Sequence, residues 1–221
     1  MRVKSKEGTR GSLMWTQRLI NNYPALLNAE LTAAGMLPAG ETVEWVSPLK
    51  DDDWAEYRDG SFLERLGLSR LQPSLRAFWP ARGPQWDALG RSGGTVYLVE
   101  AKAHAGEMAS DGAASTETSI ALIGQSLATA RTAMGASDDA DWYTGHYQFA
   151  NRLAHLHFLR QNGVDAHLVF IYFMGDADMR GPKARTEWSD AIESARKHLG
   201  FEHGSSILGV TDVFIDTNSL S

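Results

Sequence analysis

Residues 95–104 read Thr-Val-Tyr-Leu-Val-Glu-Ala-Lys-Ala-His, and this stretch decides the expected fold. A run of apolar and β-branched residues of this length predicts a strand that is buried on both faces. Because side chains alternate along a strand, Glu100 and Lys102 project from the same side as Leu98. Two opposite charges on an apolar strand are costly unless they pair with each other or hold a metal ion. The end of this strand is therefore the first candidate for chemistry.

A second acidic residue, Asp87, lies upstream in a segment that also reads as a strand, residues 85–89. The glycine-rich segment 90–94 that follows it has the composition of a tight turn. A hairpin of these two strands places Asp87 beside Glu100. We therefore expect the two carboxylates to lie together at one end of a sheet.

Asp87 and the tripeptide Glu100-Ala101-Lys102, which closes an apolar strand, together resemble the PD-(D/E)XK nuclease superfamily, which has the restriction-endonuclease-like fold. The resemblance covers about residues 51–216, which is most of the chain. One departure from the motif is visible, because Trp86 and not proline directly precedes Asp87. That proline is not a metal ligand in the family, so the departure does not touch the expected ligands.

The resemblance implies a metal-dependent nuclease that hydrolyses phosphodiester bonds of DNA in restriction, repair or defence. Asp87, Glu100 and the carbonyl of Ala101 would hold Mg²⁺ or Mn²⁺, which prefer oxygen ligands. Lys102 would lie near the attacking water and offset negative charge in the transition state. A homodimer would suit the cutting of both strands of a duplex.

Two further polar positions enter the site only through this resemblance. The superfamily often carries a metal-binding Glu on the helix before its first core strand, and Glu56 takes that place in the helix expected over residues 51–68, with Glu64 as the substitute. It also often carries a polar residue on the helix after the central strand, where Gln125 stands. A solvent-facing helical side chain is the alternative for each of these residues.

The same residues also admit a purely structural interpretation. Glu100 or Asp87 would then form an ion pair with Lys102 at the end of the sheet, without a metal. The protein would be a nuclease-like fold that serves as a binding or assembly module without turnover. A protein unrelated to the superfamily is the third possibility, and widely separated carboxylates would favour it.

The remaining segments give the expected order of elements. Helices are expected over 12–35 with a break near Pro24, 51–68, 116–134, 142–162 and 184–199, and strands over 41–47, 75–79, 85–89, 95–103, 166–174 and 207–215. Three successive strands followed by helix-linked strands predict an α/β fold with a mixed central sheet flanked by helices. An N-terminal helical appendage, residues 1–50, would pack on a nuclease-like domain, residues 51–221.

Composition limits the class of protein. Hydrophobic residues make up 43% and charged residues 22% of the 221 residues, as in a soluble globular domain. Cysteine is absent, which excludes disulfides and thiolate sites and fits a reducing compartment. No apolar run reaches membrane-spanning length and the basic start lacks the apolar core of a signal peptide, so we expect a cytoplasmic protein that does not enter a membrane.

The net charge of −6 argues against non-specific binding of nucleic acid over a broad surface. It argues neither for nor against a nuclease with an acidic metal site. The first ten residues are nevertheless basic, with the charged residues Arg2, Lys4, Lys6, Glu7 and Arg10. Such a segment is either solvated or in contact with phosphate.

Overall fold

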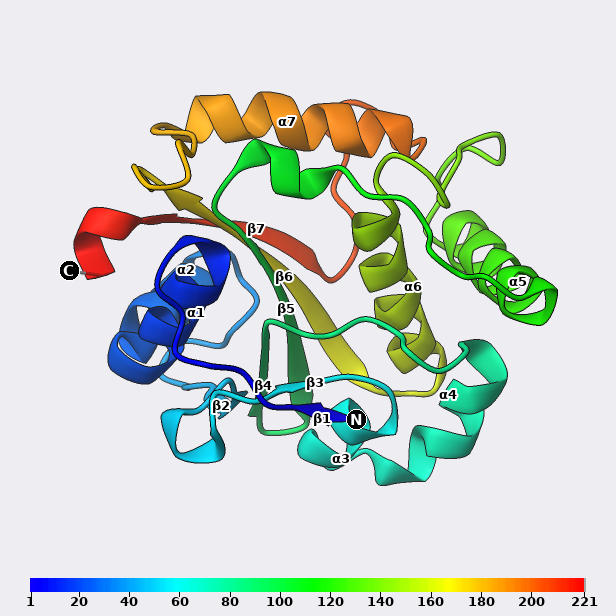
Figure 1. Ribbon diagram of the computed structural model, residues 1–221, viewed down its shortest axis with the longest axis horizontal. Helices are drawn as coiled ribbons and strands as arrows, with labels where there is room; N and C mark the ends of the chain where they lie inside the picture. The colour runs from blue at the N-terminus through cyan, green and yellow to red at the C-terminus, as the bar shows by residue number, and fades with distance from the viewer. Residues whose placement is uncertain (221) are drawn as a thin grey trace.

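A five-stranded mixed sheet lies at the centre of the computed structural model, which describes residues 1–220 (Figure 1). The strand order is β2-β4-β5-β6-β7, with bounds Glu44–Ser47, Ala88–Ser92, Thr95–Lys102, Asp165–Met174 and Val210–Asp216. Strands β2, β4 and β5 pair antiparallel, whereas β5, β6 and β7 run parallel and are joined through helices. The prediction of an α/β fold with a mixed central sheet flanked by helices is confirmed at this level.

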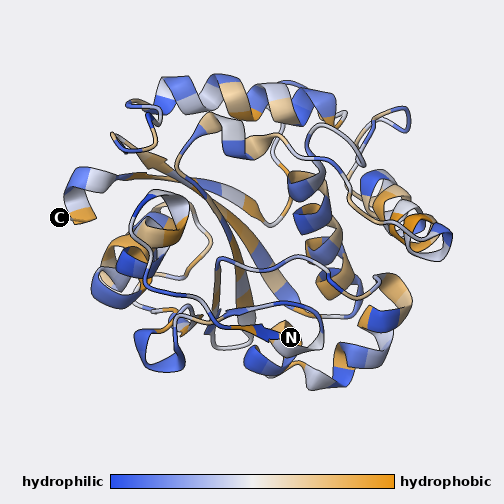
Figure 2. Ribbon diagram, viewed as in Figure 1, coloured by the Kyte–Doolittle hydropathy of each residue, from blue (hydrophilic) through white to orange (hydrophobic). Residues whose placement is uncertain are grey.

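Strand β5 is central because it pairs with β4 on one edge and with β6 on the other. Every residue of β5 after Thr95 is buried. This double coverage accounts for its continuous apolar sequence, since a strand buried on both faces has no solvent side to carry polar residues. Figure 2 shows the same pattern as hydrophobic colour along the central strands, while the flanking helices alternate between hydrophobic and hydrophilic residues.

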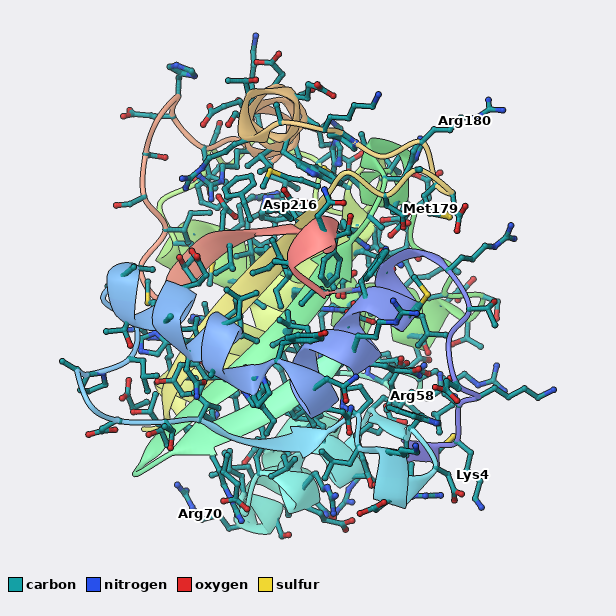
Figure 3. All side chains as sticks on the ribbon, turned by 90° about the vertical axis from the view of Figure 1, so that its left-hand side faces the viewer. Lys4, Arg58, Arg70, Met179, Arg180 and Asp216 are labelled. Atoms are coloured by element: carbon teal, nitrogen blue, oxygen red, sulfur yellow. The ribbon has the colours of Figure 1, made fainter. Side chains whose placement is uncertain are left out.

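Helices cover both faces of this sheet. One face carries α1 (Gly11–Asn22) and α2 (Pro24–Ala33), which lie in front of the strands in Figure 3. The other face carries α5 (Glu117–Ala133), α6 (Tyr147–Gln161) and α7 (Arg185–His198). Two separate apolar cores result, one on each side of the sheet. No helix within residues 1–220 combines the length and the apolar composition needed to cross a membrane.

The first fifty residues are integral to this layered structure. Strand β2 is the edge strand that pairs with β4, and α1 and α2 pack on the sheet through Leu19, Leu27 and Leu31. The side chains of β2 lie close over β4, because a Cβ atom on Gly90 would lie 2.8 Å from Trp45 Cε3. The expected boundary at residue 50 therefore has no counterpart in the packing. The expected helix break is present, since α1 and α2 meet at Pro24.

Short elements fill residues 50–80. They are η1 (Lys50–Asp52), β3 (Glu56–Tyr57), α3 (Gly60–Arg65), η2 (Ser69–Leu71) and α4 (Gln72–Phe78), while β1 (Arg2–Val3) pairs antiparallel with β3. Two further 3-10 turns, η3 (Ala105–Met108) and η4 (Thr217–Leu220), follow β5 and β7.

Two predicted elements in this region are wrong. The helix expected over residues 51–68 is interrupted because Asp53, Trp54 and Asp59 adopt positive φ angles of 51°, 53° and 53°, which a right-handed helix does not admit. The strand expected over residues 75–79 is instead part of helix α4, which has a proline in its first turn. Proline suits that position because the first amides of a helix have no partner inside it.

The basic N-terminal residues are partly engaged by the chain itself. Arg2 pairs with Asp52 at 2.7 Å and with Asp53 at 3.0 Å, and Lys4 pairs with Asp53 at 2.8 Å. Lys4 projects at the lower edge of the molecule in Figure 3. These contacts hold β1 beside β3, the strand that carries the predicted site residue Glu56.

Candidate functional site

The hairpin of β4 and β5 forms with the register that the sequence indicates. Ala88 pairs with Val99, and the backbone N–H of Asp87 donates to the Val99 carbonyl at 3.2 Å. Asp87 therefore stands beside Glu100 at the open end of the hairpin. The alternation of β5 turns Glu100 and Lys102 toward the face that carries α6.

A cleft of about 660 Å³ opens at this end of the hairpin. Its floor is formed by Asp87 and by β5 from Glu100 to Lys102. The surrounding walls come from β3, the segment 79–85, η3, the first turn of α6 and the start of α1. Elements that are distant in the sequence thus converge on the residues singled out by the motif.

Glu100 is held by two cations. Its Oε1 accepts a hydrogen bond from Lys102 Nζ at 2.5 Å, and its Oε2 accepts from Arg152 Nε at 2.7 Å. All three side chains are buried. Burial by itself raises the pKa of Glu100, but the guanidinium of Arg152 and the ammonium of Lys102 outweigh it and hold that pKa below the usual value. Glu100 is therefore ionised.

Asp87 and Glu56 form fewer contacts than Glu100, because each accepts a single hydrogen bond from an uncharged donor. Asp87 Oδ2 accepts from the backbone N–H of Ala101 at 2.7 Å, and Glu56 Oε2 accepts from the side-chain amide of Gln85. Burial, followed by repulsion from Glu100 and Glu56, raises the pKa of Asp87 well above its usual value. Burial and then Glu100 likewise raise the pKa of Glu56, in spite of the bond from Gln85. The cleft therefore contains more carboxylates than cations to balance them.

Lys102 has a second acceptor in the cleft. Its Nζ donates to Gln148 Oε1 at 2.8 Å, in addition to Glu100. An ammonium group has three donors, so these two acceptors leave one N–H free to face the cleft. Gln148 comes from the first turn of α6 and holds the ammonium beside the carboxylates.

The donor set fits a divalent cation only in part. Within residues 1–220, no three Asp, Glu, His or Cys side chains are arranged so that they could hold a metal ion. Asp87 Oδ1 and Glu56 Oε1 receive no hydrogen bond from these residues, and both carboxylates have raised pKa values. Carboxylates of that kind gain from a nearby positive charge. Glu100 would join them only by giving up contacts with Lys102 and Arg152.

Five of the predicted site residues line this cleft together: Glu56, Asp87, Glu100, Ala101 and Lys102. Glu56 reaches it from strand β3, where the sequence predicted a helix. The side chain of Ala101 packs in the opposite core, so this residue can offer only its backbone to the cleft.

Glu64 and Gln125 lie outside the cleft. Glu64, on α3, accepts a hydrogen bond from Gln72 Nε2 at 2.7 Å. Gln125 is exposed on α5 and is not among the residues that line the cleft. The role that the resemblance assigned to Gln125 is therefore not available to it, and the polar helical residue that touches the lysine is Gln148 on α6.

Arg152 is the residue that sequence reasoning missed. It binds Glu100, donates to the Gln85 carbonyl at 2.8 Å, and lies 5.0 Å from the centroid of the Trp86 ring. The available signal was its position on α6 between apolar neighbours such as Phe149 and Leu153, because an arginine inside an apolar helix face needs an acidic partner.

Comparisons with protein-family models, with curated proteins and with solved structures return no match to this chain. The function is therefore inferred from the geometry and charge of the cleft.

Proposed function

We propose that this protein is a divalent-cation-dependent nuclease that hydrolyses phosphodiester bonds of DNA, of the PD-(D/E)XK type. The observation that carries the proposal is the meeting of Asp87, Glu100 and Lys102 in one cleft at the end of a central hairpin. Three antiparallel strands followed by helix-linked parallel strands are compatible with it, although β2 and not the expected segment 75–79 supplies the first of the three.

The cation would be Mg²⁺ or Mn²⁺. Asp87 and Glu56 would hold it, with the Ala101 carbonyl and Glu100 as further ligands, because oxygen donors and several retained waters satisfy such an ion. A bound ion of this kind would supply a water of lowered pKa and would screen the charge of the phosphate. The raised pKa values of Asp87 and Glu56 support this assignment, because a bound cation would favour the ionised carboxylates that burial and their acidic neighbours disfavour.

The chain's own cations have separate tasks in this proposal. Lys102, held by Gln148, would orient the attacking water and offset the charge that develops on the phosphate. Arg152 would keep Glu100 ionised and in place through its bond to Oε2. Neither cation needs to lose a proton for these tasks.

A second function is favoured by one specific observation. Both oxygens of Glu100 are already occupied by Lys102 and Arg152, so the cluster is satisfied without any ligand. A protein with this closed cluster would serve as a binding or assembly module without turnover.

Cleavage assays with a matched pair of variants separate the two functions. Wild-type protein is incubated with supercoiled, linear and single-stranded DNA, and with RNA, in Mg²⁺ or Mn²⁺. We expect cleavage that chelation abolishes and that Asp87→Asn reduces by about a hundredfold or more. Glu64→Gln makes the same carboxylate-to-amide change outside the cleft and should leave cleavage intact. Equal activity of Asp87→Asn and wild type would indicate a contaminant, and inactivity of the wild type on every substrate would favour the binding module.

A further inference from the structure

A second hollow borders the segment 79–83 and adjoins the cleft. Its volume is about 400 Å³, and its walls come from the start of α3, from α4 and from α6. Trp79 and Gly83 line both the hollow and the cleft, so the two spaces share a wall. We call this hollow the Trp79 pocket, lined by Asp59, Gly60, Gln72, Leu75, Arg76, Trp79, Pro80, Ala81, Gly83 and His155.

His155 places an unused hydrogen-bond acceptor in the Trp79 pocket. Its side chain is 1% exposed, and Nδ1 lies 2.8 Å from the Asn151 carbonyl. A carbonyl only accepts, so Nδ1 carries the ring proton and Nε2 carries a lone pair. Burial lowers the pKa of His155 to about 3, which keeps the ring neutral near pH 7. No residue within 1–220 donates to Nε2.

Trp79 places an unused donor next to this acceptor. Its side chain is 4% exposed, its ring centroid lies 4.8 Å from that of His155, and its Nε1–H donates to no residue of the described chain. A Cβ atom on Gly83 would lie 3.3 Å from Trp79 Cδ1, the atom bonded to Nε1, and 3.6 Å from His155 Nε2. The Cδ1 side of the indole, a carboxylate oxygen of Asp59 at 3.5 Å and the acceptor of the imidazole therefore border the same space beside Gly83.

We infer that the Trp79 pocket binds a nucleobase. A nucleobase presents donors and acceptors side by side on one edge of a flat ring, and so satisfies both unused groups at once. Leu75 and Pro80 supply apolar surface for the faces of that ring, and the volume lies in the range of small-ligand sites. A free sugar matches less well because it has no flat apolar faces to lie against Leu75 and Pro80.

Because the pocket and the cleft share a wall, the bound base would belong to the nucleic-acid strand in the cleft. This step rests on the proposed nuclease function. A nucleotide with its phosphate in the cleft can place an unstacked base in the Trp79 pocket, which is how enzymes reach or sort a base outside the helix. The preferred substrate would then be single-stranded DNA, or duplex DNA at an unpaired position.

Nucleoside binding tests the pocket without relying on cleavage, because a nucleoside contains no phosphodiester bond. Full-length protein labelled with ¹⁵N at histidine is titrated with adenosine, guanosine, cytidine and uridine, and with ribose as the control. We expect at least one nucleoside to shift the Nε2 resonance of His155 saturably, and ribose to leave it unchanged. A protein that shows no shift with any nucleoside would overturn the inference.

Variants locate the binding. Ala81→Phe places a ring at the exposed mouth of the pocket and should weaken nucleoside binding at least about tenfold. Ala77→Phe makes the same change at an exposed position of α4 that borders a different hollow, and should leave binding unchanged. Trp79→Phe keeps an aromatic ring but removes the N–H, and should weaken binding about fivefold to tenfold. Binding unaffected by Ala81→Phe would place the nucleoside elsewhere and contradict the inference.

Competition identifies the source of the base. If the base belongs to the substrate strand, the bound nucleoside inhibits cleavage of single-stranded DNA, and an oligonucleotide with one abasic residue is cut more slowly at that place. If cleavage is absent but the nucleoside still shifts His155, the pocket stands and the proposed nuclease function fails. The two failures are therefore distinguishable.

Discussion

The two faces of strand β5 are built from alternate residues of one segment, yet they are stabilised in different ways. On one face, Val99 and Ala101 pack in the apolar core beneath α1 and α2. On the other face, Glu100 and Lys102 form a buried ion cluster with Arg152 of α6. Burial of hydrocarbon on the apolar face stabilises the folded state. On the charged face, the attraction between the ions must first offset the cost of removing them from water.

The two faces therefore differ in how much they contribute to the stability of the fold. A buried ion pair is on balance no better for stability than well-packed apolar side chains, so stability alone does not explain three buried charges at the end of β5. The apolar face supplies the rigidity that holds the strand in place. The charged face would then be free to keep the arrangement that the proposed chemistry requires.

Removing the charge of Glu100 should have the largest effect on stability. Glu100→Gln keeps the shape of the side chain but leaves Lys102 and Arg152 buried without their acidic partner, which typically costs about 3–5 kcal/mol. Val99→Ala, on the apolar face of the same strand, should cost about 2 kcal/mol. Urea unfolding of the two variants measures both losses. A smaller loss for Glu100→Gln than for Val99→Ala would show that the cluster is not paired as described.

Replacing the whole cluster serves as the control for that prediction. The triple variant Glu100→Leu, Lys102→Met and Arg152→Met removes all three charges of the cluster together, so none of the three is left without its partner. Apolar replacement of a complete buried ion cluster is often neutral or stabilising. Stability of the triple variant should therefore recover above that of Glu100→Gln, while divalent-ion-dependent cleavage stays absent.

The next effect is a dependence of stability on pH that arises from Asp87. Because its pKa is raised in the folded state, the folded protein retains a proton that the unfolded chain has already released. The contribution of Asp87 to stability is therefore greatest below the unfolded pKa of about 3.9 and is lost as the pH rises through the folded pKa. Urea unfolding at a series of pH values, in the presence of a chelator, should show this fall in the wild type and a weaker fall in Asp87→Asn.

Divalent ions should counteract the same loss. An ion that binds only the folded protein stabilises it by about 2.7 kcal/mol at a free concentration a hundred times its Kd. Mn²⁺ should therefore raise the melting temperature of the wild type at pH 8 more than that of Asp87→Asn. An equal rise in the two proteins would place the ion outside the cleft.

The parts of the site that the sequence predicted depend on local periodicity. The alternation along 95–104 placed Glu100 and Lys102 on one face, and the hairpin brought Asp87 beside Glu100, because both relations are set within about fifteen residues. The turn is shorter than the expected 90–94, since β4 extends to Ser92, which pairs with Thr95. The apolar run of β6 was predicted for the same reason, since it pairs with β5 and is covered on both faces.

The remaining parts depend on contacts that no local pattern encodes. Arg152 reaches Glu100 from a helix 52 positions later, and Glu56 reaches the cleft only because left-handed residues at 53 and 54 stop the expected helix. The resemblance assigned Gln125 its role as a polar residue on the helix after the central strand, but two helices follow β5 before β6. The second of them, α6, is the one that lies over the charged residues.

The pair Gln148 and Gln125 tests this last distinction with the smallest expected effects. Gln148→Ala removes one of the two acceptors of Lys102, and a hydrogen bond to a charged group contributes about 1.5–3 kcal/mol, so cleavage should fall by about tenfold or more. Gln125→Ala changes an exposed side chain and should shift stability by less than about 0.5 kcal/mol and leave cleavage unchanged. Both are measured as initial rates of DNA cleavage beside urea unfolding. If Gln125→Ala lost activity while Gln148→Ala kept it, α5 and not α6 would support Lys102. That outcome would contradict the hydrogen bond between Lys102 and Gln148.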